Sequence, residues 1–170
     1  MESEYRKIVE LIRYGHEEEL KNALVEFINQ NKSSEEGIRI IRRLFLGLRL
    51  EPRMRVKKIF LTAVAETAIW DPEVLDTVFL IARDDPEPEL RELAEKVALK
   101  VLETADKKVK KDVFIFLLKA IDRRLIYIAP TDLVRIGGLD VAREIMNDER
   151  IGKNLKDLLQ YGIEASSKSK

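Results

Sequence analysis

The sequence predicts an all-α protein, and three observations carry this prediction. The chain of 170 residues contains only seven glycines and five prolines. It lacks the alternation of apolar and polar residues that is typical of half-buried strands, whereas apolar residues recur at spacings of three and four along most of its length. The length favours a single domain, which we place at residues 1–165, followed by a disordered tail at 166–170.

Start and stop signals divide the first two thirds of the chain into six predicted helices. Ser33 and Glu36 are a candidate capping box for the third helix, because each side chain can accept a hydrogen bond from a free backbone N–H. Pro52 and Pro72 fit first-turn positions, and Asp71 fits the N-cap before Pro72. The predicted helices run over about 4–14 and 17–30, from the Ser33 cap to 49, over 52–68, from 72, and within 84–105.

The last third of the chain is predicted to contain four more helices. The seventh covers about 106–121, and its apolar core, VFIFLL, is expected to be buried on several sides. Residues 125–129 fit either helix or extended chain. Pro130 then starts a short helix that Gly137 and Gly138 end, and helices over 139–146 and 151–162 complete the pattern.

Charge and composition restrict the classes of function. There are 31 basic and 31 acidic residues, so the net charge is zero, and a general nucleic-acid binder or a polybasic membrane anchor is not expected. Cysteine is absent, which excludes disulfides, thiol nucleophiles and cysteine-bound metals and fits a reducing compartment. We therefore expect a cytoplasmic protein without a membrane association. The charged fraction of 36% is also typical of proteins from thermophiles.

Two parts of the chain repeat each other. Residues 52–55 (PRMR) align with residues 88–91 (PELR). Residues 66–68 and 103–105 both read ETA, at nearly the same offset. A period of about 36 or 37 residues is typical of stacked helical hairpins.

The stretch DDPEPELRELAEKVAL, which begins at residue 84, resembles the HEAT-repeat signature, in which an Asp-Pro turn leads into a helix that carries an arginine and then small residues. An aspartate caps the helix, a proline fixes φ, alanines let neighbouring hairpins approach, and the arginine can bond a turn carbonyl or a carboxylate. The matching positions are Asp85, Pro86, Arg91, Ala94 and Ala98.

Residues 133–159 look like an armadillo unit, because a short helix and a glycine-containing turn precede two longer helices. The resemblance is most specific over 71–105 and weaker over 34–68 and 131–160. It implies a right-handed α-solenoid of about four HEAT/armadillo-like helical hairpins. In this superfamily the second helices of the hairpins line a concave surface that usually binds another macromolecule, although the fold does not choose the partner.

No motif in the sequence indicates catalysis, a metal or a cofactor. His16 opens HEEEL, which lacks the second histidine of a zinc-protease motif. Asp84 and Asp85 lie near Glu87 and Glu89, but the pattern of an EF-hand loop is missing and helix capping accounts for Asp85. A nucleophile beside a base and a glycine-rich phosphate loop are both absent. We therefore expect a protein that is not an enzyme.

Clusters of basic residues are the strongest candidates for contact with a partner. One interpretation is that they form solvated faces that pair with acids on neighbouring hairpins. The other is that they bind phosphates or an acidic partner surface. The candidates are Arg39, Arg42 and Arg43 on the third helix, Arg55 and Lys58 on the opposite face of the same hairpin, and Lys107, Lys108 and Lys111 at the start of the seventh helix.

The leading hypothesis is a non-enzymatic helical-repeat module that binds a protein partner or acts as a scaffold subunit. The alternative is binding to a nucleic-acid backbone through the basic stripes, for which interleaved aromatic residues are lacking. A third possibility is a resemblance to the HEAT-like DNA glycosylases, which need a pocket with aromatics and a carboxylate. Trp70 and Asp71 are the one adjacent pair of that kind. The oligomeric state stays open.

Overall fold

A computed structural model describes residues 2–168, which fold into α-helices joined by turns and short irregular segments. No strand occurs in this range, so the all-α prediction is confirmed. None of the helices within it has the length and apolar character needed to cross a membrane. The helices are α1 (Glu2–Tyr14), α2 (Glu17–Asn31), α3 (Glu35–Leu48), α4 (Met54–Thr67), α5 (Pro72–Asp84), α6 (Pro88–Thr104), α7 (Lys107–Asp122), α8 (Pro130–Gly137), α9 (Leu139–Ile145) and α10 (Lys153–Lys168).

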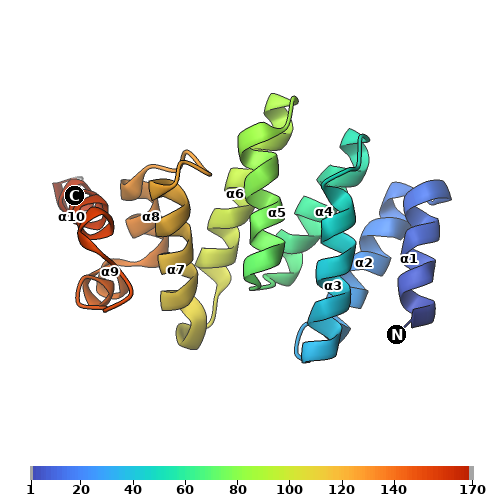
Figure 1. The fold of residues 1–170 in the computed structure, drawn as a ribbon, viewed down its shortest axis with the longest axis horizontal. Helices are drawn as coiled ribbons and strands as arrows, with labels where there is room; N and C mark the ends of the chain where they lie inside the picture. Colours follow the sequence, from blue (N-terminus) through green and yellow to red (C-terminus); the bar gives the residue numbers. More distant parts are fainter. Residues whose placement is uncertain (1, 169–170) are drawn as a thin grey trace. The chain divides into compact units, whose positions relative to one another are not determined.

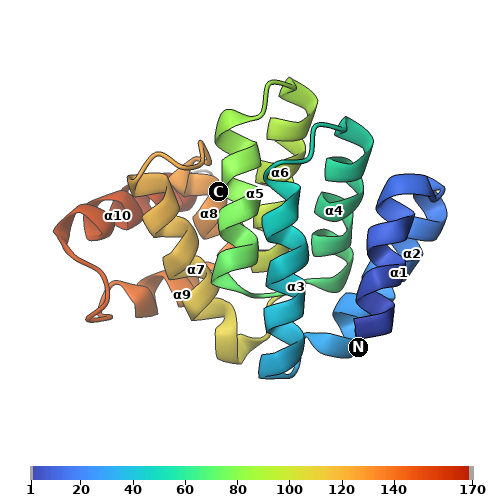
Figure 2. The same cartoon turned by 45° about the vertical axis from the view of Figure 1, so that its right-hand side comes forward.

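The chain divides into two compact units, residues 1–97 and 98–170, and the boundary falls inside α6. In the first unit α2 packs against α4 and α3 packs against α5. Figures 1 and 2 show α1, α3 and α5 in front of α2 and α4, so these helices form two layers. Phe45 of α3 and Phe60 of α4 join the layers through an edge-to-face contact with ring centroids 5.1 Å apart.

The start of α3 lies one residue later than predicted. Ser34, and not Ser33, is the N-cap, and its hydroxyl accepts a hydrogen bond from the backbone N–H of Gly37 at 3.0 Å. Gly37 is required here, because a Cβ at this position would lie 2.0 Å from the carbonyl oxygen of Asn31. The tight turn between α2 and α3 therefore selects the second of two adjacent serines.

The starts of α4 and α6 also differ from the prediction. Pro52 precedes α4, which begins at Met54, because Glu51 accepts hydrogen bonds from the backbone N–H and the Nε of Arg53 and closes a local turn. Asp85 does not cap α6. It accepts from the backbone N–H of Glu87, and α6 begins at the second proline of the stretch, Pro88.

The buried face of α6 follows the apolar residues that recur along it at helical spacing, except at one position. Leu90, Ala94, Val97 and Val101 are buried, whereas Leu93 is half-buried. The buried face of α6 is therefore narrower than the distribution of its apolar residues indicates.

In the second unit α10 packs against α7 and α8. The VFIFLL segment of α7 is buried except for the half-buried Phe116, as predicted. Residues 123–129 are not helical, which resolves the ambiguity at 125–129 in favour of non-helical chain. Residues 166–168 belong to the last turn of α10, where a disordered tail was expected, and 169–170 lie outside the described residues.

We expect two glycine-to-alanine substitutions to change stability in opposite directions. Gly137→Ala should lower the free energy of unfolding by about 1–3 kcal/mol, because the new Cβ would lie 2.4 Å from the Phe114 ring. Gly47→Ala, in α3 with nothing within 4 Å of the new Cβ, should raise it by about 0.5–1 kcal/mol. Chemical denaturation measures both, and equal effects would contradict this packing.

Candidate functional site

The turn before α5 is fixed by a buried aspartate. Asp71 is 3% exposed and caps α5 by accepting from the backbone N–H of Val74 at 3.2 Å. The same carboxylate binds Arg42 of α3 in a fork, with Nη2 at 2.6 Å and Nε at 3.0 Å. The hydrogen bond to Asp71 raises the pKa of Arg42. Asp71 therefore joins α3 to α5, and both oxygens of its carboxylate already accept hydrogen bonds from within the fold.

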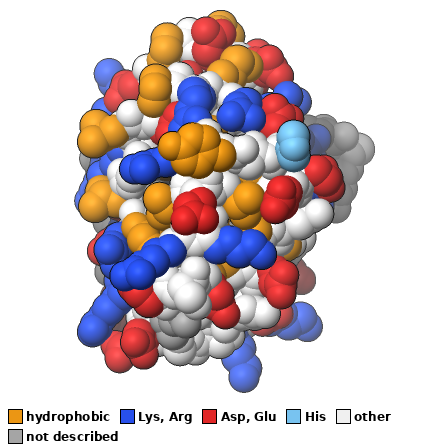
Figure 3. Space-filling view, turned by 90° about the vertical axis from the view of Figure 1, so that its right-hand side faces the viewer, with side chains coloured by type: hydrophobic (Ala, Val, Ile, Leu, Met, Phe, Trp, Pro, Cys, Tyr) orange, Lys and Arg blue, Asp and Glu red, His pale blue; other side chains and the backbone are white. Residues whose placement is uncertain are grey.

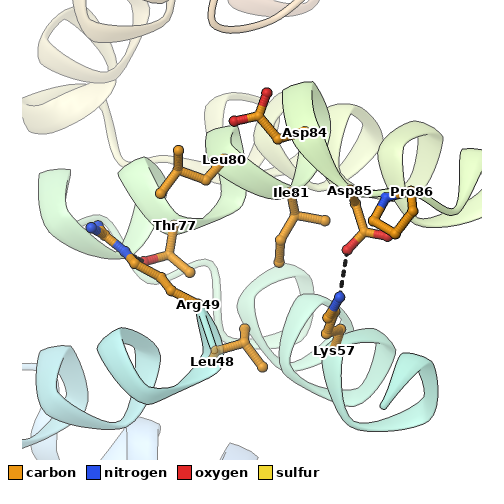
Figure 4. A pocket seen from close by; sticks show the side chains of 9 residues that line it. All are labelled: Leu48, Arg49, Lys57, Thr77, Leu80, Ile81, Asp84, Asp85 and Pro86. Carbon is orange, nitrogen blue, oxygen red and sulfur yellow. Dashed lines mark hydrogen bonds and ion pairs between the residues drawn. The ribbon is translucent and has the colours of Figure 1, made fainter. Parts of the chain in front are cut away.

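A second buried aspartate fixes the turn between α5 and α6. Lys57 of α4 donates to Asp85 at 2.8 Å, and the side chains are only 14% and 3% exposed (Figure 4). Arg91 donates to the backbone carbonyl of Asp85 at 2.6 Å, as expected for the arginine of the repeat signature. The neighbouring Asp84 pairs with Arg83. Nothing in residues 2–168 gathers three or more potential metal-ligating side chains.

A groove follows the junction of α3 and α5. It consists of three adjoining sections of about 400, 320 and 270 Å³. The first and middle sections share Arg39 and Arg42, and the middle and last share Arg49 and Thr77, so each section adjoins the next. Figure 4 shows the last section, where Arg49 lies beside Thr77. We call this surface the α3–α5 groove.

The middle section carries an excess of positive charge. Four guanidinium groups, those of Arg39, Arg42, Arg43 and Arg49, line it together with one carboxylate, Glu73. Only Arg42 is bound by a carboxylate at short range, that of Asp71. The other three arginines are therefore not neutralised by a close ion pair.

The three guanidinium groups differ in their surroundings. Arg43 lies over the ring of Tyr5, 4.6 Å from its centroid. Arg49 donates from Nε to the neutral hydroxyl of Thr77 at 3.1 Å. Arg39 is exposed and has no side-chain partner within residues 2–168. The guanidinium groups thus keep donors for a ligand.

Apolar side chains lie beside the arginines. Leu46 lines the middle section and is 59% exposed, and Leu50, just after α3, is 89% exposed. Arginine is enriched at protein interfaces, and an exposed leucine beside it offers apolar area for a partner to bury. The α3–α5 groove is therefore the candidate functional site.

The predicted basic stripe on α4 is balanced by acids. Arg55 and Lys58 line a second groove, between α2 and α4, with a volume of about 480 Å³. Lys21, Arg55 and Lys58 face an equal number of carboxylates there, and Lys58 is paired with Glu89 at 3.1 Å. The carboxylates are those of Glu17, Glu18 and Glu89. This groove has no excess of positive charge.

The lysines of α7 belong to the second unit. Lys111 pairs with Asp148 at 3.2 Å. Lys107 and Lys108 are exposed and have no side-chain partner among the described residues. In both units, therefore, some of the basic residues singled out in the sequence form ion pairs within the fold and others have no partner among the described residues.

A network that the sequence did not reveal fixes the turn between α9 and α10. Arg150 donates to Asp148 through Nε and Nη2, both at 3.0 Å, and to Asp112 of α7 at 2.5 Å. The hydrogen bonds from Arg150 lower the pKa of Asp148 and raise that of Arg150. Asp112 and Asp148 lie far apart in sequence, so no local pattern signals the network.

The end of the first unit seen in Figure 3 carries basic and acidic side chains interspersed with apolar ones, without a field of one sign. Comparisons of the chain with models of protein families, with curated proteins and with solved structures find no match. The charges and contacts of the residues themselves are therefore the basis for a functional proposal.

Asp71→Ala is expected to lower the free energy of unfolding by about 2–4 kcal/mol, because it removes a helix cap and leaves Arg42 without its carboxylate. Glu73→Ala is the matched control. It removes a carboxylate that is 64% exposed and 3.8 Å from Arg42, and the expected loss is below about 1 kcal/mol. Urea denaturation that ranks the two variants the other way would contradict the role of Asp71.

The Asp148 network predicts a dependence of stability on pH. Because the pKa of Asp148 is lower in the folded chain than its ordinary value of 3.8, the ionised carboxylate stabilises the fold in full above that value. This stabilisation is lost as the pH falls from that value through the lower folded-state pKa. The stability difference between the wild type and Asp148→Asn should be constant from neutral pH to about 5 and shrink below about 4. Denaturation at several pH values tests this. Glu149→Gln, in the same turn, should not reproduce that profile.

Proposed function

We propose that this chain is a non-enzymatic helical-repeat interaction module, of the HEAT/armadillo-like type, that binds a protein partner through the α3–α5 groove. The helices of residues 2–168 would form an α-solenoid of about four hairpins. The packing of α2 on α4 and of α3 on α5 supports this, because in stacked hairpins each helix packs on the equivalent helix of the next hairpin. The Asp-Pro turns at Asp71 and Asp85 support it further, since both carry a buried aspartate bound to an upstream cation.

The observation that carries the proposal is the combination of three arginines without a carboxylate partner and the exposed Leu46 in the middle section of the groove. Arg39, Arg43 and Arg49 lie beside Leu46 without a close carboxylate partner. Arginine and large apolar side chains together supply both the specificity and the buried area of a protein interface.

Affinity purification from cells of the source organism tests this function. Leu46→Asp should reduce recovery of the partner about tenfold or more, because it places a charge at the centre of the interface. Tyr14→Asp is the matched control, since Tyr14 is 85% exposed, lies at the end of α1 and does not line the α3–α5 groove. The wild type and the control should recover the same partner. Identical recovery by all three proteins would contradict the proposal.

A further inference from the structure

We propose that the α3–α5 groove binds an acidic segment of the partner, with carboxylates at two ends of a short stretch and an apolar side chain between them. This inference rests on the proposed function and specifies the partner's chemistry. The middle section of the groove supplies matching groups in that order along α3, namely Arg39, Leu46 and Arg49.

The spacing along α3 determines the length of the segment. Arg39 and Arg49 are ten positions apart, and a helix rises about 1.5 Å per residue, so their Cα atoms are separated by about 15 Å along the axis. An extended peptide covers about 3.3 Å per residue and spans this distance in four or five residues. Acidic residues about four positions apart would therefore reach both arginines.

Leu46 is positioned to contact the side chain between the acids. At about 100° per residue, Leu46 lies within about 20° of Arg39 around α3, and Arg43 lies within about 40° on the other side. Arg39, Leu46 and Arg43 therefore leave the same face of the helix, and Arg49 lies about 80° from Arg39, on the side of Leu46, and lines the same section of the groove. Leu46 is 59% exposed, so an apolar side chain that covers it would gain buried apolar area.

The hydrogen-bonding capacity of the arginines favours carboxylates. A guanidinium group has five N–H donors in a planar fork that matches a carboxylate. Arg49 uses its Nε–H on Thr77, and Arg39 makes no side-chain bond within residues 2–168. Arg43 lies over Tyr5, which occupies one face of its guanidinium plane and leaves the N–H edges to a ligand. Each arginine can therefore accept an acidic partner without losing a structural contact.

Two features of the groove disfavour a nucleic-acid backbone. Glu73 lines the middle section and would repel a regular row of phosphates, whereas a peptide can place an apolar or polar residue opposite it. The residues that line the middle section also include no aromatic ring on which a base would stack, and Trp70 in the first section is the one aromatic residue in the lining of the groove. An acidic peptide with an apolar side chain fits both features.

A displayed library of random peptides, each of 12 residues, tests the inference with the full chain as the target. Selection on the wild type should enrich peptides with Asp or Glu about four positions apart and an apolar residue between them. A synthetic enriched peptide should bind about tenfold or more weakly after its Asp and Glu are replaced by Asn and Gln, because two charge-assisted pairs are lost.

Matched variants of the protein locate the binding site. Arg39→Gln should weaken binding of the enriched peptide about fivefold, and the further change Arg49→Gln should bring the loss to tenfold or more. Arg55→Gln removes an equally exposed arginine that lines the α2–α4 groove, and it should change binding less than about twofold. Arg39 and Arg55 have no side-chain partner in the described chain, so thermal melts should be unchanged.

The outcomes separate this inference from the proposed function. Enriched peptides without acidic residues, or binding that Arg55→Gln removes and Arg39→Gln does not, would overturn the acidic-segment proposal. Binding of a duplex DNA probe through Arg39 and Arg49, without enrichment of acidic peptides, would also overturn it and assign the groove to nucleic acid. If either of these results is obtained but Leu46→Asp still abolishes recovery of a protein partner, the acidic-segment proposal is wrong and the proposed function as an interaction module is still supported.

Discussion

The contact between Arg42 and Asp71 is the interaction on which the first unit depends. One buried carboxylate caps α5 and binds a guanidinium group from α3, so it determines both where α5 begins and how α5 sits on α3. Asp85, in the turn between α5 and α6, also binds a cation, Lys57, and it accepts a hydrogen bond from the backbone N–H of Glu87 without capping α6. A buried aspartate without these partners would be costly, so each turn and its ion pair stabilise each other.

This arrangement explains why adjacent basic residues on α3 have different roles. Arg42 forms an ion pair with Asp71 at the start of α5. Arg39 is exposed to solvent, and Arg43 stacks over the ring of Tyr5. The middle section of the α3–α5 groove keeps an excess of positive charge, because Asp71 neutralises only one of its four arginines and Glu73 is the one carboxylate that lines it. In the α2–α4 groove, by contrast, acids from α2 and α6 balance the cations.

The sequence predicts what depends on neighbouring residues and misses what depends on distant ones. The cap by Asp71 was predicted, because an aspartate before a proline is a local signal. The cap at Ser34 was misplaced by one residue, because the close approach of Gly37 to Asn31 selects the serine and periodicity does not report it. The basic residues of α3 were identified as a cluster. Their division into bound and free cations depends on partners about 29 positions away and required the structure.

The most direct test of this division is NMR of the arginine Nε–H groups, recorded before and after adding an acidic peptide with an apolar residue between its carboxylates. The account predicts a slowly exchanging Nε–H for Arg42 that keeps its chemical shift, and shift changes for Arg39 and Arg49. Two results would contradict the proposal that Arg42 stabilises the fold while Arg39 and Arg49 bind a partner. One is a change in the chemical shift of Arg42 together with the others, and the other is unchanged shifts of Arg39 and Arg49 at saturating peptide.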